Sequence, residues 1–365
     1  MSDRKNGDFI FIFTVAILVL IGTVMVFSAS YYTALNAEGD AYYYLKRQII
    51  WVAIGTFVMI VASRFPYKVY GIWAMPIILV AGFLLLLVWT PLGVEINEAR
   101  RWIGVGSLTI MPGELAKPAV AVFVAKYLSR KPGIIKDFKQ GVLPTLAVMV
   151  VFAGLIMMQP SMSTAMTLCG IVIFIMIAAG MKMSHLAGLG IVGVSAAVAL
   201  VAISPYRMVR ATSFLDPFAD PLGSGFQAVQ SLLALGSGGL FGVGLGKSIQ
   251  KTLYLPEPMN DFIFSIIGEE LGFIGCLLII ALYIVFIWRG IHIAINAKDM
   301  FGMLLATGIT SMIAIQVVLN IAVVTSSMPP TGVSLPFISW GGSSLVVLMG
   351  CAGIMVNISK NSVRY

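Results

Sequence analysis

The stretch LPEPMNDFIFSIIG, residues 255–268, contains the transition that organises this chain. It closes a long loop, residues 206–261, and opens an apolar run, in a sequence that otherwise alternates apolar runs with short polar turns. Asp261 stands at the junction, so we expect its carboxylate at a membrane surface beside a glycine-rich, arginine-bearing loop. Such a position suits chemistry on a lipid-borne substrate.

The composition outside this stretch assigns the class. Hydrophobic residues make up 59% of the 365 residues and charged residues 10%, with a mean hydropathy of +0.99. A soluble surface carries far more charge, so the sequence predicts an all-α polytopic membrane protein with one integral domain, residues 1–365. At about 20 apolar residues per span, we expect ten transmembrane helices. They are 9–29, 49–63, 70–90, 115–128, 141–158, 163–180, 184–204, 262–288, 302–325 and 335–356.

The Lys and Arg distribution predicts the orientation. Ten spans place both termini on one side, and fourteen of the 23 basic residues then fall on that side, which the positive-inside rule makes cytoplasmic. The apolar run after MSDRKNGD is too long for a signal peptide, so we expect a retained helix. Nine basic residues remain outside, which indicates an anionic ligand on the outer face. These are Lys46, Arg47, Arg100, Arg101, Lys117, Arg207, Arg210, Lys247 and Lys251.

Two functional classes are disfavoured. No basic stripe is interleaved with exposed aromatic residues, so we expect no nucleic-acid partner. The three cysteines lie within apolar runs and the two histidines stand singly at predicted turns, which argues against a zinc site. Acid or base chemistry therefore falls to carboxylates.

Asp261 permits two interpretations. Pro256 and Pro258 favour an extended, stiff approach to it. The carboxylate can cap the following helix, a contribution of about 1 kcal/mol, or it can act as a catalyst.

The long loop also contains SFLDPFADPLGSGFQ, residues 213–227. Asp216 and Asp220 are candidates for a divalent cation site, but each is followed by proline, which favours turn caps. Further on, GSGGLFGVGLGKS has Phe241 where a phosphate-binding P-loop needs glycine, and no predicted strand precedes it. We expect a closely packed re-entrant segment instead.

Four arginines are candidate ligands for a pyrophosphate. Arg207 and Arg210 follow the seventh predicted span, and Arg100 and Arg101 precede Trp102 in the second outer loop. A guanidinium can bind pyrophosphate through two parallel hydrogen bonds. Interfacial snorkelling is the alternative.

Two further sets of charges lie within apolar runs. Glu114 and Lys117 are three residues apart, so we expect an ion pair on one helical face that either positions a pyrophosphate or fixes the helix. Glu269 and Glu270 are adjacent and would point about 100° apart, away from any single partner. We expect at least one of them to pair with a basic residue on a neighbouring helix.

A set of motifs carries a family resemblance. They are KRQ at 46–48, ARRWI at 99–103, GELAK at 113–117, QP at 159–160, DPFADPLGSGFQAVQSL with GSGGLFGVGLG, LPEPMNDFIFSIIGEELGFIG at 255–275 and PPTGVSLPFISWGGSS at 329–344. The chain resembles the SEDS family of shape, elongation, division and sporulation proteins, typified by FtsW, RodA and SpoVE. The DPFADPLGSGFQ loop is closer to the division and sporulation branch.

The resemblance implies a glycosyltransferase that polymerises lipid II into peptidoglycan on the outer face of the bacterial cytoplasmic membrane, with a class B penicillin-binding protein as partner. It implies Asp261 as the essential carboxylate. It further implies roles for Arg47 with Gln48, Arg101 with Trp102, and Glu114 with Lys117. Ser161 stands where the family usually has an acidic residue.

The residues and the resemblance together predict a mechanism. Asp261 acts as general base on the acceptor sugar, while Arg101, Arg207, Arg210, Lys117 or a divalent cation, magnesium or manganese, stabilises the departing pyrophosphate. Two alternatives are a lipid II flippase driven by Glu269 or Glu270, and a scaffold that docks and activates a transpeptidase. No inverted repeat with paired broken helices supports the flippase.

Overall fold

The chain folds mainly into helices. The structure is a computed structural model that describes residues 7–362, apart from 97–98, 106–107, 204–207, 210–212 and 253. The longer helices are α1 (Phe9–Glu38), α2 (Tyr43–Arg64), α4 (Ala74–Leu87), α5 (Pro112–Ser129), α6 (Leu143–Met158), α7 (Met162–Ala178), α8 (Met183–Ile203), α10 (Phe226–Ser237), α11 (Ile263–Ile295), α12 (Met300–Val324) and α13 (Gly342–Lys360). Short turns of helix are α3 (Tyr67–Ile72), η1 (Ile134–Lys136), η2 (Phe138–Val142) and η3 (Pro217–Ala219).

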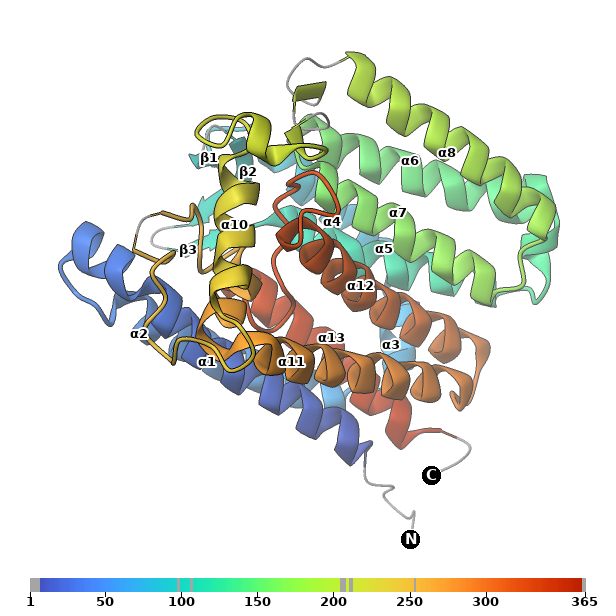
Figure 1. Ribbon diagram of the computed structural model, residues 1–365. Coiled ribbons are helices and arrows are strands. Elements are labelled where there is room, and N and C mark those ends of the chain that lie inside the picture. Colours follow the sequence, from blue (N-terminus) through green and yellow to red (C-terminus); the bar gives the residue numbers. More distant parts are fainter. Residues whose placement is uncertain are drawn as a thin grey trace, which may run out of the picture.

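Six of these helices are long and apolar enough to cross a membrane, and the protein is a polytopic membrane protein. The six are α1, α2, the continuous run Phe138–Met158, α11, α12 and α13. In Figure 1, α12 runs through the middle of the bundle, and two thirds of its most apolar window is buried against 17% for α2. The outward apolar side chains of α2 therefore face lipid, whereas α12 belongs to the protein core.

Each predicted span coincides with helix, with two differences. The third is broken at Trp73 between α3 and α4, three residues before Pro76, whose missing N–H and bulky ring disfavour a continuous helix. The tenth begins at Gly342 instead of 335. Pro336 and the Gly341-Gly342 pair keep the preceding residues in an irregular segment, 331–341.

A small sheet adds to the all-α prediction, which missed it. Strands β1 (Gly93–Ile96), β2 (Ala99–Val105) and β3 (Leu108–Ile110) pair antiparallel in the order β1-β2-β3. Their β-branched residues suit a pleated surface. Val94 faces Trp102 while Glu95 faces Arg100, so Arg101 is an extra residue in a β-bulge.

The predicted long outer loop is partly helical. After η3 it forms α10, whose Ser231 hydroxyl donates to the carbonyl of Val324 on α12 at 2.6 Å and lies 2.8 Å from the Ser265 hydroxyl of α11. The glycine-rich segment then packs along α11. This agrees with the expected close packing, although its depth in a membrane stays a prediction.

Helix α11 is interrupted at Gly272, where φ is +69° and ψ −168°. The glycine-rich segment supplies hydrogen bonds across this break: the amide of Val243 donates to Glu269 O, and that of Phe273 donates to Gly239 O, each at 2.9 Å. A Cβ on Gly272 would lie 2.3 Å from the Gly242 nitrogen, so only glycine fits here.

The two ends of the described chain meet at one end of the bundle. The Asp8 amide donates to the Ser359 hydroxyl at 3.1 Å. The Asp8 carboxylate caps α1 through the Phe11 amide and pairs with Arg289 of α11. The common side that we expect for both termini agrees with this contact.

Candidate functional site

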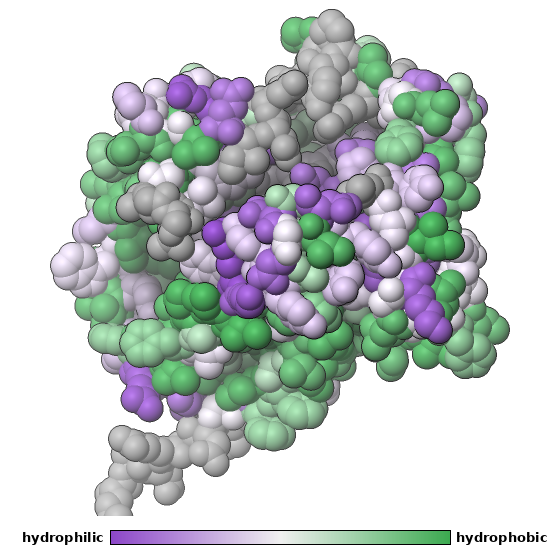
Figure 2. Space-filling view, turned by 90° about the vertical axis from the view of Figure 1, so that its left-hand side faces the viewer, coloured by the Kyte–Doolittle hydropathy of each residue, from purple (hydrophilic) through white to green (hydrophobic). Residues whose placement is uncertain are grey.

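A cavity of about 550 Å³, lined by charged and polar as well as apolar side chains, lies among the ends of several helices. Six of the residues nominated from the sequence as catalytic or substrate-binding line it, and they come from four segments of the chain: Arg47, Arg101, Trp102, Glu114, Lys117 and Asp261. Figure 2 looks onto the left-hand side of the molecule as drawn in Figure 1, and shows hydrophilic residues gathered around the middle of that face. Residues from position 47 to position 344 thus share one site.

Asp261 enters the cavity immediately before α11. The helix has Phe262 as its N-cap, so Asp261 does not occupy the capping position. The Asn320 side chain on α12 donates to the Asp261 carbonyl at 2.8 Å. Gly332, with φ +68°, approaches so closely that a Cβ there would lie 3.2 Å from Asp261 Oδ2.

The approach to Asp261 is a turn, so the expected extended approach was wrong. Glu257 takes φ +51°, and its carbonyl accepts from the Asn260 amide at 3.1 Å. The Asn260 side chain also donates to the Glu257 carboxylate. Because a residue before proline avoids the right-handed helical region, Pro258 favours a turn here. Glu257 joins Asp261 on the cavity wall.

The β-bulge explains how Arg101 and Trp102, consecutive in a strand, both reach the cavity. Two backbone carbonyls hold the Arg101 guanidinium. Its Nε donates to Gln159 O at 3.1 Å and its Nη2 donates to Pro160 O at 2.6 Å. The Gln159 side chain donates in turn to Leu85 O at 2.9 Å. The guanidinium is therefore fixed in orientation before any ligand arrives.

The predicted Glu114–Lys117 ion pair is confirmed. Lys117 Nζ lies 2.7 Å from Glu114 Oε1 on the first turns of α5, and both side chains are buried. The Ser344 hydroxyl of α13 donates to the other carboxylate oxygen at 3.0 Å. Nearby, the Arg47 guanidinium stacks 4.4 Å above the Tyr43 ring. Gln48 is fully buried and does not line the cavity.

Two nominated arginines, Arg207 and Arg210, lie outside the described residues. Of the candidate cation pair, Asp220 caps a turn through its carboxylate, whereas Asp216 precedes η3 without a side-chain capping hydrogen bond. The amide and hydroxyl of Ser224 and the amide of Gly223 donate to Asp220, and the hydrogen bonds from Ser224 lower the pKa of this carboxyl. Within the part of the chain that the structure describes, no three His, Cys, Asp or Glu side chains gather as metal ligands.

Several cavity residues escaped the sequence reasoning. The irregular segment 331–341 contributes Gly332, Val333, Ser334, Trp340 and Gly341, and α12 contributes Gln316. The signal was the proline and glycine content of PPTGVSLPFISWGG, which argues against a membrane helix from residue 335. The Gln316 Oε1 atom is buried and accepts no hydrogen bond from the described residues, so a ligand hydroxyl can satisfy it.

The cavity combines the Asp261 carboxylate, at the start of α11, with three cationic side chains, Arg47, Arg101 and Lys117. Glu114 and Glu257 are the other carboxylates in its lining. Carboxylates accept protons and guanidinium or ammonium groups bind phosphate oxygens. The arrangement suits a reaction in which a proton leaves one substrate group while negative charge develops on another.

Comparison with known proteins supports this description. The family model for the FtsW, RodA and SpoVE proteins, described as cell cycle protein, matches residues 8–364. The chain is 45% identical to stage V sporulation protein E of Bacillus subtilis over 367 residues, covering 100% of both chains. It is 41% identical over 360 residues to the probable peptidoglycan glycosyltransferase FtsW of a Geobacter species, covering 98% of each.

Two solved structures share the fold. One, from a study of the structural coordination of polymerization and crosslinking by a peptidoglycan synthase complex, is 26% identical with a TM-score of 0.80, covering 98% of this chain and 99% of that one. The other is the rod shape determining protein RodA of Thermus thermophilus, 28% identical with a TM-score of 0.72, covering 98% of each chain.

Proposed function

Because the chain belongs to the FtsW, RodA and SpoVE family of cell cycle proteins, we propose that it is a peptidoglycan glycosyltransferase. Its substrate is lipid II, which it polymerises into β-1,4 glycan strands for cell division or sporulation. The observation that carries the proposal is the cavity that gathers Asp261 with Arg47, Arg101 and Lys117. Relatives named as probable peptidoglycan glycosyltransferases support the same activity.

Asp261 serves as the general base. Its carboxylate accepts the proton from the 4-hydroxyl of the acceptor N-acetylglucosamine as that oxygen attacks the anomeric carbon of the lipid-linked donor. The bond between this carbon and the pyrophosphate breaks, and attack from the opposite face converts an α linkage into a β linkage. The Asn320 side chain holds the main chain at Asp261, and the close approach of Gly332 restricts the space around the carboxylate, so both limit its position for this step.

The leaving pyrophosphate gains negative charge as the bond breaks. Arg101 is oriented by two backbone carbonyls, and Lys117 is oriented by Glu114, so both can meet that charge without reorganisation. Arg47 lines the same cavity and adds a third cation. Arg207 and Arg210 remain further candidates on the long loop.

A divalent cation, magnesium or manganese, is part of the proposal. Such ions are commonly held by one or two carboxylates together with substrate phosphate oxygens. Glu257 is the cavity carboxylate that would hold it while Asp261 takes the proton. When bound, the ion would neutralise part of the pyrophosphate charge.

Membership of the family supports a proposal for where the protein acts and with which partner. We place the protein in the bacterial cytoplasmic membrane with both termini inside and the cavity facing outward, where it acts with a class B penicillin-binding protein. The basic-residue distribution supports this orientation. The structural relative from a peptidoglycan synthase complex supports the partner.

The test is a polymerisation assay with purified protein, lipid II, magnesium and the cognate transpeptidase. Glycan strands resolved by gel electrophoresis support the proposal. Vesicles that translocate labelled lipid II without forming strands would instead support a flippase. A transpeptidase activated by this protein while lipid II is neither polymerised nor translocated would support the scaffold.

A further inference from the structure

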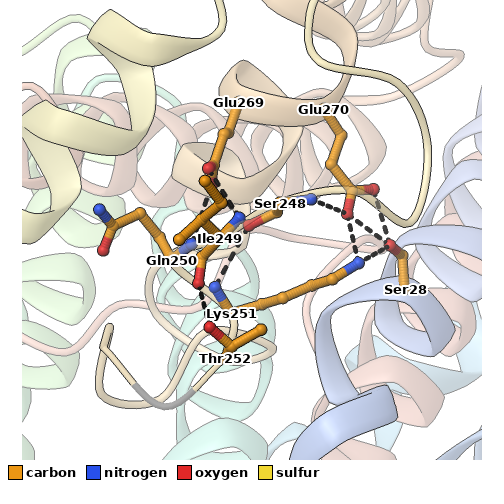
Figure 3. Close-up of polar contacts among 8 residues, drawn as sticks. All are labelled: Ser28, Ser248, Ile249, Gln250, Lys251, Thr252, Glu269 and Glu270. Atoms are coloured by element: carbon orange, nitrogen blue, oxygen red, sulfur yellow. Dashed lines mark hydrogen bonds and ion pairs between the residues drawn. The ribbon is translucent and has the colours of Figure 1, made fainter.

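A buried charged cluster lies outside the cavity, where the long loop crosses α11 and α1 (Figure 3). Lys251 Nζ lies 2.6 Å from Glu270 Oε1, and each side chain is at most 1% exposed. Ser28 of α1 joins them: its hydroxyl lies 2.7 Å from both Glu270 oxygens and accepts from Lys251 Nζ at 3.0 Å.

The adjacent carboxylate, Glu269, holds the same stretch of loop. It accepts from the Ser248 hydroxyl at 2.5 Å, the Ile249 amide at 2.8 Å and the Gln250 amide at 3.4 Å. The expectation that the two glutamates would not share a partner was wrong, since the Ser248 hydroxyl donates to Glu269 and the Ser248 amide donates to Glu270 at 3.4 Å. Of the two, Glu270 has the predicted basic partner, but Lys251 comes from the loop and not from a helix.

Stability alone explains this cluster poorly. Taking charges out of water is costly, and replacing a buried ion pair by apolar residues of similar volume is often neutral or stabilising. Where such groups are present, one documented use is to fix one arrangement of the chain among several. Lys251 and Glu270 are therefore candidates for fixing the conformation of the chain between them.

We infer that Lys251 and Glu270 are positioning residues for Asp261, an inference that rests on the proposed function. Lys251 precedes Asp261 by ten positions in the sequence. Glu270 follows Asp261 by nine positions on α11, about 13 Å along the helix axis. The ion pair thus closes a ring of chain that contains Asp261. Ser28 ties this ring to α1.

Other contacts hold the opposite side of the ring. The Met259 carbonyl accepts from the Trp340 amide at 2.9 Å, and the Asn260 carbonyl accepts from the Ser339 hydroxyl at 2.6 Å. The Leu255 amide donates to Gln250 O at 2.9 Å. This hydrogen bond links the residues next to Lys251 with the turn that precedes Asp261. Asp261 therefore lies between two sets of contacts. The segment 339–340 supplies one set, and the Lys251–Glu270 cluster, next to α1, supplies the other.

The test replaces the pair by Lys251→Met with Glu270→Met, which removes both charges at similar volume. Thermal unfolding in detergent should shift by less than about 4 °C, because no buried charge is left unpaired. KM for lipid II should change by less than about twofold while kcat falls about tenfold or more, because a misplaced base slows chemistry and not binding. Hydrogen exchange of the peptide 255–262 should become faster.

The matched control is the ion pair of Asp8 with Arg289, toward the opposite end of α11. Asp8→Asn with Arg289→Met keeps a capping side chain and should leave kcat and exchange at 255–262 unchanged. Native kcat or unchanged exchange in the Lys251/Glu270 variant would overturn the inference, as would an equal loss of kcat in the control.

Ser28→Ala and hydrogen exchange at 255–262 test the positioning role independently of the double variant and of turnover. If the double variant does not fold, Ser28→Ala removes only the link to α1 and should lower kcat severalfold at constant KM; native kcat would overturn the inference. Hydrogen exchange of the peptide 255–262 is measured without substrate, so it does not depend on glycosyltransferase activity. A native chain that makes no glycan therefore overturns the proposed function, while unchanged exchange in an otherwise active system overturns only the positioning role.

Discussion

Lys117 and Glu114 form an ion pair in the wall of the cavity, with Nζ and Oε1 2.7 Å apart and the Lys117 side chain 1% exposed. Ser344 binds the second carboxylate oxygen, so helix α13 restrains the same pair. The pair has two separable roles, since it can stabilise the junction of α5 with α13 and can present a cation to the substrate.

The first prediction separates these roles. Lys117→Met leaves Glu114 buried without its cation and should destabilise the protein by about 3 kcal/mol or more. The double variant Glu114→Gln with Lys117→Met should recover most of that stability yet stay inactive, because the cation for the pyrophosphate is missing. Thermal unfolding and polymerisation measured on the same samples check this. An active double variant would show that the pair only fixes the helix.

The second prediction concerns Arg101. Arg101→Lys should lower kcat/KM about 10- to 100-fold, because an ammonium does not reproduce the fork that holds two carbonyls and still meets a phosphate oxygen. Arg100→Lys is the matched control, since Arg100 is exposed on the same strand and does not line the cavity. Equal effects of the two substitutions in the polymerisation assay would remove Arg101 from the site.

The third prediction concerns the break in α11. Gly272→Ala places a Cβ 2.3 Å from the Gly242 nitrogen in a backbone conformation that only glycine adopts readily. The backbone strain alone should cost about 1–3 kcal/mol. Gly188→Ala in α8, where a Cβ meets nothing within 4 Å, should leave the unfolding midpoint unchanged or raised. An unchanged unfolding midpoint for Gly272→Ala would show that the interruption of α11 at Gly272 is not required for the native structure.

The fourth prediction concerns metal removal. Chelation should abolish polymerisation, and magnesium or manganese should restore it. The unfolding midpoint without substrate should not change, because the described residues contain no group of three metal-ligating side chains. A midpoint that falls on chelation would point to a structural ion and contradict this account.

Much of the helical framework was predictable, because an apolar run long enough to cross a membrane indicates a membrane helix. The pairing of Glu114 with Lys117 was also predictable, since residues three apart share a helix face. The joint placement of Arg47, Arg101, Trp102 and Asp261 came from the family resemblance. No local pattern brings residues so far apart in sequence to one cavity.

Other features escaped the sequence because they depend on tertiary contacts. The sheet at 93–110 is too short for a clear alternating pattern, and its bulge at Arg101 arises from pairing with β1. The partner of Glu270 is a lysine on a loop 19 residues earlier, to which helical periodicity gives no guide. Irregular backbone at 331–341 was hidden by its apolar composition, although its prolines and glycines carried the signal.

The central claim is that Asp261 is the general base, and the most direct measurement is single-turnover polymerisation of lipid II by native, Asp261→Asn and Glu257→Gln proteins. Asp261→Asn is nearly isosteric and should bind lipid II and unfold like the native protein, while strand formation falls below detection. Glu257→Gln should retain measurable turnover at high magnesium concentration. Strands from Asp261→Asn at the native rate would contradict the account and direct the search for the base to Glu257.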